Sequence, residues 1–152
     1  MTGDSANDKQ KAAEMGRACV CFNIRKSTRL LTAHYDRVLI PTGLKATQFS
    51  LLMTVLLQNS ASVSQLANML GMDRTTLSRN VRVLSQKGLL YVSTGEEDRR
   101  EQRIGLTVKG REAIDQAIPF WEEAQAEVVA RFGEEWVQGF LSNLKQLNRL
   151  KA

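Results

Sequence analysis

Two short helical segments, each ended by a glycine, constrain the fold of this chain more than any other feature of its sequence. The first segment covers residues 65–70 and ends at Gly71, and the second covers residues 74–87 and ends at Gly88. Glycine is typical of the position just after a helix, because it adopts the left-handed backbone there without a steric penalty. Two short helices joined by such a tight turn predict a helix-turn-helix.

The pattern changes directly after Gly88. Residues 89–93 and 103–107 are two short segments with strand character, and the connection between them is charged and contains Gly95. This arrangement predicts a β-hairpin with a long tip. The sequence therefore predicts a mainly α fold with a small β-hairpin wing, that is, a winged helix-turn-helix.

Long helices are expected on both sides of this segment. Residues 17–40 contain no glycine or proline, which predicts one continuous helix that is apolar on two sides. Further helices are predicted over residues 108–130, with Pro119 inside, and over residues 134–150. Four side chains are predicted to cap helix starts: Thr47, Ser64, Asp73 and Thr107.

The second helix of the helix-turn-helix has an outward face without acidic residues. Leu77, Val81 and Leu84 are expected to face the first helix, and no acid occurs over residues 74–86. Arginines and short hydroxyls can contact guanine edges and phosphates in a major groove, and the chain carries a formal net charge of +5. The alternative is an ordinary solvated face. The residues predicted to contact DNA are Arg74, Thr75, Thr76, Ser78, Arg79 and Arg82.

A second arginine cluster lies at the expected hairpin tip. Arg99 and Arg100 are followed by Arg103, and Asp98 stands beside them. An extended hairpin could place Arg99 or Arg100 in the adjacent minor groove. Asp98 is expected to orient one guanidinium through a bidentate pair. The alternative is a solvated loop of mixed charge.

Three runs of sequence resemble the MarR family of bacterial transcription regulators: GLKATQFSLL from Gly43, LANMLGMDRTTLSRNVRVLSQKGLL from Leu66, and EEDRREQRIGLTVKG, which ends at Gly110. The likeness extends over about residues 17–150. It implies a homodimer that represses by binding double-stranded DNA at an inverted-repeat operator and is released by a small-molecule effector. The implied organisation is a flexible tail over residues 1–14, a helical dimerisation region over 15–45 and 112–152, and a winged lobe over 46–111.

The resemblance also suggests where a signal could act. Cys21 and Tyr35 are similar in position to residues of the branch that senses organic hydroperoxides, although Arg25 stands where that branch has a tyrosine. Alternatively, Arg25, His34 and Tyr35 line an effector crevice, or Cys19 and Cys21 are small buried hydrophobes. On one continuous helix the two cysteines would lie about 200° apart and could not bridge.

Other classes of function find little support. No nucleotide-binding, nucleophile-elbow or zinc-protease motif occurs, so we expect neither an enzyme nor a cofactor. One histidine and two cysteines are too few for a structural zinc site, so no metal is expected. No apolar run approaches the roughly 20 residues of a membrane span, and the polar N-terminus favours a cytoplasmic location. A winged-helix module that binds protein instead of DNA remains the alternative from another class.

Overall fold

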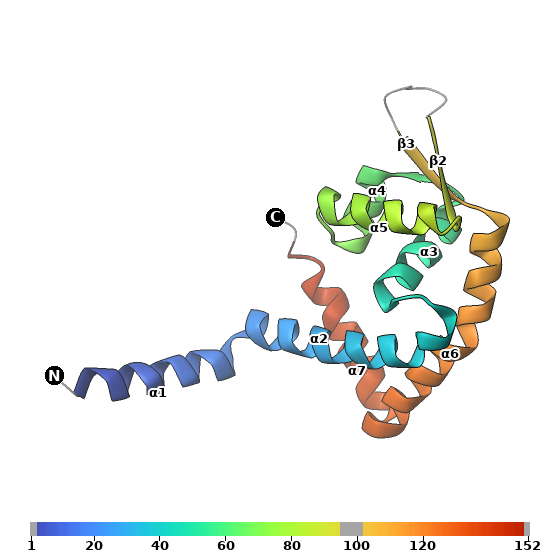
Figure 1. The fold of residues 1–152 in the computed structure, drawn as a ribbon. Coiled ribbons are helices and arrows are strands. Elements are labelled where there is room, and N and C mark those ends of the chain that lie inside the picture. The colour runs from blue at the N-terminus through green and yellow to red at the C-terminus, as the bar shows by residue number, and fades with distance from the viewer. Residues whose placement is uncertain (1–2, 95–101, 151–152) are drawn as a thin grey trace. The chain divides into compact units, whose positions relative to one another are not determined.

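The computed structural model describes residues 3–94 and 102–150. The chain divides into two compact units, residues 1–34 and residues 35–152, and each is described by itself. Figure 1 shows the order of elements: α1 (Gly3–Ala18), α2 (Val20–Val38), the short 3₁₀ helix η1 (Ile40–Thr42), α3 (Ala46–Gln58), β1 (Ala61–Ser62), α4 (Val63–Leu70), α5 (Arg74–Gln86), β2 (Leu90–Thr94), β3 (Gln102–Leu106), α6 (Val108–Phe132) and α7 (Glu134–Leu147).

The described part of the first unit is helical from Gly3 onward. The expectation of a flexible tail over residues 1–14 was wrong, because α1 covers Gly3–Ala18. The segment contains four alanines and two lysines, which are among the strongest helix formers. The polar character of the segment was mistaken for a lack of structure.

A break at Cys19 divides the helix that was predicted over residues 17–40. The Asn23 side-chain amide donates to the carbonyls of Gly16, Arg17 and Cys19 at 3.1, 3.1 and 2.9 Å. The carbonyls of Gly16 and Arg17 lie in the last turn of α1, and an uninterrupted helix would have bonded them internally. The Cys19 carbonyl also accepts from the backbone N–H of Asn23 at 3.1 Å. Cys19 lies outside both helices, and its Sγ accepts from the backbone N–H of Phe22 at 3.4 Å. The argument that the two cysteines diverge on one continuous helix therefore fails.

The winged lobe contains a small antiparallel sheet of three strands in the order β1-β3-β2. Strands β2 and β3 pair in register from Leu90 opposite Leu106 to Thr94 opposite Gln102. These strands lie within one residue of the predicted ones. The sequence analysis missed β1, whose two residues pair with Ile104 and Arg103 on the other edge of β3.

The core of the lobe lies where α4, α5 and the sheet meet α3 and α6. Leu66, Leu77, Leu84 and Ile104 have no exposed surface and belong to one cluster of buried side chains. The predicted contact between the two helix-turn-helix segments is confirmed by the burial of their facing leucines. The core therefore fixes α5 by one face and leaves its opposite face exposed.

Two of the four predicted helix caps are confirmed and two are wrong. The side chain of Asp73 caps α5, and that of Thr107 caps α6. Ser62 caps α4 in place of Ser64, because the chain turns into the helix directly after β1. At α3 the N-cap residue is Lys45 and not Thr47. The first free N–H groups there bond to other side chains: that of Lys45 to Gln48 Oε1 at 3.1 Å, and that of Ala46 to Asp36 Oδ1 at 2.7 Å.

A close approach between α6 and the wing requires glycine. A Cβ atom on Gly110 would overlap the carbonyl oxygen of Leu89, just before β2. On the wing itself, a Cβ on Gly105 would overlap the ring of Tyr91, its cross-strand partner. Gly110 therefore allows the start of α6 to pack closely against the wing, and Gly105 leaves room for the ring of Tyr91 within the wing.

Candidate nucleic-acid interface

The outward face of α5 carries the residues that the sequence singled out. Arg74, Thr75, Thr76, Ser78, Arg79 and Arg82 are all exposed, whereas Leu77, Val81 and Leu84 are buried. The predicted orientation of the helix is therefore confirmed. Apart from Val83, the exposed side chains of α5 are polar or basic, which suits contact with a polyanion.

The N-terminal end of α5 is held by Asp73. Its carboxylate accepts from the backbone N–H of Thr76 at 2.8 Å and from the Thr76 hydroxyl at 2.6 Å. These hydrogen bonds stabilise the charged form, so the pKa of Asp73 lies below its ordinary value. The cap also fixes the side chain of Thr76, one of the predicted DNA contacts.

The cap should give the stability of the protein a pH dependence. Because the pKa of Asp73 is lower in the folded than in the unfolded state, the charged cap contributes stability above the ordinary carboxyl pKa of about 4. This contribution is lost as the pH falls through the lowered folded value. We expect Asp73→Ala to lower the melting temperature clearly at pH 7 and much less at pH 2.5. Asp73→Ser keeps a capping oxygen but no charge, so it should be more stable than Asp73→Ala by a similar margin at both pH values. An equal loss for Asp73→Ala at both pH values would contradict this account.

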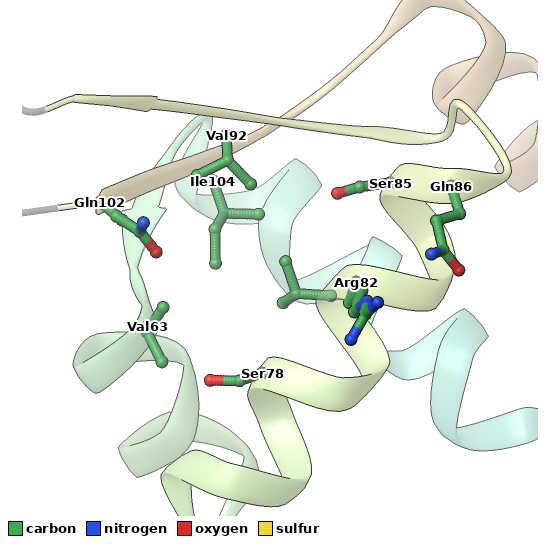
Figure 2. Close-up of a pocket in the computed structure, with 9 residues that line it drawn as sticks. Val63, Ser78, Arg82, Ser85, Gln86, Val92, Gln102 and Ile104 are labelled. Atoms are coloured by element: carbon green, nitrogen blue, oxygen red, sulfur yellow. The ribbon is translucent and has the colours of Figure 1, made fainter.

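A hollow of about 500 Å³ lies between α5 and the wing. Figure 2 shows Ser85 pointing from α5 into this hollow, beside Val92 and Ile104 of the wing, and Ser78 pointing into it on the side of Val63. Among the described residues, the Ser85 hydroxyl is a buried oxygen without a hydrogen-bond partner. The predicted contacts Ser78 and Arg82 line this hollow together with Val63, Val81, Gln86 and Gln102. The wing residues were not found from the sequence, because only the fold brings them beside α5.

The predicted tip contacts Asp98, Arg99 and Arg100 lie outside the described residues. Arg103, the remaining arginine of that cluster, is half-buried on β3 and bonds to Ser60. The alternative of a solvated loop therefore does not hold for Arg103, because its side chain is partly buried and hydrogen-bonded.

The residues proposed for sensing differ in solvent exposure and in hydrogen bonding. Cys19 and Cys21 are exposed in the single chain, so the alternative of two buried hydrophobes is wrong for it. Arg25 is exposed, and His34 is half-buried. The Tyr35 hydroxyl donates a hydrogen bond to Gln125 Oε1, which connects the end of α2 to α6. Partial burial raises the pKa of Tyr35 above its ordinary value.

Within residues 3–94 and 102–150, the structure brings together no group of three metal-ligating side chains. In the same part of the chain, no helix is both long and apolar enough to cross a membrane.

The sequence profile of the MarR family matches residues 42–101. A solved structure of the M. tuberculosis transcriptional regulator MosR in complex with DNA is 42% identical to this chain. The match covers 86% of this chain and 96% of MosR, with a TM-score of 0.75. This chain belongs to the MarR family. A second structure of MosR is 38% identical, covers 90% of this chain and 99% of MosR, and also has a TM-score of 0.75.

The MarR family consists of winged helix-turn-helix transcriptional regulators and not of enzymes. Among curated proteins, an uncharacterised HTH-type transcriptional regulator of Bacillus subtilis, YwaE, is 26% identical over 106 residues. That match covers 70% of this chain, and the chain spans 62% of the length of YwaE.

Proposed function

We propose that this protein is a homodimeric, sequence-specific DNA-binding repressor that recognises an inverted-repeat operator. The observation that carries the proposal is the exposed, acid-free face of α5 beside the wing. A module that binds protein would favour an apolar or acidic face, and this face is neither. The DNA complex of MosR, at 42% identity, supports the same reading.

The second unit leaves an apolar surface exposed on α6 and α7. Phe132, Trp136 and Phe140 form a stack, with ring centroids 4.7 and 5.1 Å apart. About half of the surface of Phe132 and of Trp136 is exposed. Large exposed apolar patches mark interaction sites in soluble proteins. In the first unit Phe22, Leu30 and Leu31 are also exposed on α2. We infer that these side chains form the interface with a second copy.

Sedimentation velocity tests the dimer and its DNA complex together. We expect a species of twice the 17.0 kDa chain mass at micromolar concentration, and one such dimer on each operator duplex. Phe140→Glu should shift the protein toward monomer, because it places a charge among stacked rings. Val83→Glu, on the exposed side of α5, should leave the dimer intact. A wild-type monomer at these concentrations would refute the homodimer.

Release from the operator by a small-molecule effector is part of the proposal. The family resemblance suggests Arg25, His34 and Tyr35 as contacts. Tyr35 already has a partner in Gln125, so a ligand there would compete with that hydrogen bond. We place the protein in the cytoplasm, where its operator DNA would lie.

Cys21 supports a second candidate function, thiol-based control of DNA binding. It is exposed in the first turn of α2, directly after the break at Cys19. A Cys21 thiolate would attack an organic hydroperoxide, break its O–O bond and become a sulfenic acid while an alcohol leaves. The new polar group would alter packing at the start of α2.

Operator affinity before and after one equivalent of cumene hydroperoxide tests this candidate. We expect the oxidised wild type to lose affinity and Cys21→Ser to keep it, with Cys19→Ser as the matched control. Mass spectrometry distinguishes one added oxygen from the loss of two hydrogens in a disulfide. Equal release of wild type and Cys21→Ser, or no release at all, would remove Cys21 as the sensor.

A further inference from the structure

Arg103 occupies the central strand of the wing sheet. In the strand register it pairs with Ser93 of β2 on one side and with Ser62 of β1 on the other. Its side chain is half-buried, unlike the exposed arginines of α5. Its position in sequence groups it with Arg99 and Arg100, but its contacts point away from a DNA-facing role.

The Arg103 guanidinium bonds to both oxygens of Ser60. Nε donates to Ser60 Oγ at 3.2 Å, and Nη2 donates to Ser60 Oγ at 3.0 Å and to the Ser60 carbonyl at 3.1 Å. A planar guanidinium is suited to such a forked contact, and lysine cannot reproduce it fully. The contact links residues that are 43 positions apart in the chain.

Ser60 lies in the turn that ends α3. The preceding residue, Asn59, has a φ of 58°, and it is the one non-glycine residue with positive φ in the described part of the chain. The negative end of the α3 dipole points at this turn, so a cation is favoured there. Arg103 therefore stabilises a turn with a costly backbone conformation.

The same turn determines where the helix-turn-helix begins. From Ser60 the chain passes through Ala61 to Ser62, whose side chain accepts from the backbone N–H of Gln65 and caps α4. Arg103 thus connects the central strand of the wing to the residue two positions before this cap. The hydrogen bonds restrict how the wing can move relative to α4 and α5.

We propose that Arg103 is a positioning residue that holds the wing against the helix-turn-helix, so that α5 and the wing meet the DNA in a fixed geometry. It acts through Ser60 and makes no contact with DNA. The inference rests on the proposed function, because its consequence is measured as operator affinity.

Four variants test the proposal in the full-length protein. Arg103→Gln should weaken operator binding about tenfold, within the range for charge-assisted hydrogen bonds. Arg103→Lys should recover part of the loss. Ser60→Ala changes no charge, yet it should also weaken binding. The double variant Ser60→Ala/Arg103→Gln should be no weaker than Arg103→Gln alone. An unaffected Ser60→Ala would overturn the proposal, and so would additive losses from two damaging changes in the double variant. Such additivity would identify Arg103 as an independent DNA contact.

A spectroscopic measurement separates this inference from the proposed function. Spin labels at Ser93→Cys on β2 and Gln86→Cys on α5, in a Cys19→Ser/Cys21→Ser background, report the distance between wing and helix in the free protein. We expect Arg103→Gln to broaden the distance distribution and Arg103→Lys to restore part of its width. An unchanged distribution would overturn the proposal even if DNA binding is confirmed. If the wild type binds no DNA, the proposed function fails, and the broadening still decides whether Arg103 holds the wing.

Discussion

Arg79→Ala should lower operator affinity by about 5- to 150-fold for each half-site, which corresponds to a loss of roughly 1–3 kcal/mol for each bidentate contact to guanine. Arg79 is exposed on the outward face of α5, one turn after the capped start of the helix. Its loss should also relax the preference at one base pair in each half-site. Competition binding with single-base operator variants measures both effects.

The same experiment distinguishes base reading from phosphate contact. If Arg82→Ala weakens all sequences equally and lowers the slope of log K against log salt by about 0.9 for each protomer, or about 1.8 for the dimer, Arg82 contacts a phosphate. The exposed Arg149, near the end of the chain, provides a charge-matched control, and Arg149→Ala should change neither affinity nor specificity. Wild-type affinity and specificity in Arg79→Ala would contradict the assignment of Arg79 as a base contact.

Leu77→Ala should cost about 2–5 kcal/mol of unfolding free energy, the range for truncating a fully buried leucine. Leu77 lies on the inner face of α5, between the exposed residues Thr76 and Ser78, and none of its surface is exposed. Chemical denaturation at fixed protein concentration measures the loss, since dimerisation makes apparent stability depend on concentration.

Val83→Ala is the matched control for the core. Val83 is on the same helix and 39% exposed, so its truncation should change stability by about 0.5 kcal/mol or less. A loss near this value for Leu77→Ala would show that α5 is not anchored by its inner face. Burial of the inner face would then not explain why the predicted DNA contacts of α5 face outward.

Local sequence rules were sufficient for the elements that carry the candidate site. Gly71 ends α4 in the left-handed conformation, Asp73 caps α5, and the helical period separates Leu77 from Ser78 and Arg79. Each of these features depends on residues within about two turns of helix. For this reason the outward face of α5 could be predicted correctly.

Features that depend on distant residues could not be predicted in the same way. The strand β1 has two residues and exists through its pairing with β3, and the contact of Arg103 with Ser60 spans the whole helix-turn-helix. The break at Cys19 depends on the side chain of Asn23, which bonds three carbonyls in place of the helix. Amino-acid composition and the periodicity of apolar residues do not predict contacts of this kind.

Selection of duplexes from a random DNA pool by the full-length protein tests the central claim most directly. The account predicts enrichment of an inverted repeat whose half-site centres lie about 10 base pairs apart, because a two-fold dimer presents two copies of α5 to successive major grooves. A parallel selection with Arg79→Ala should relax one position in each half-site. Enrichment of no common sequence, or of a single unrepeated site occupied by one chain, would contradict the account.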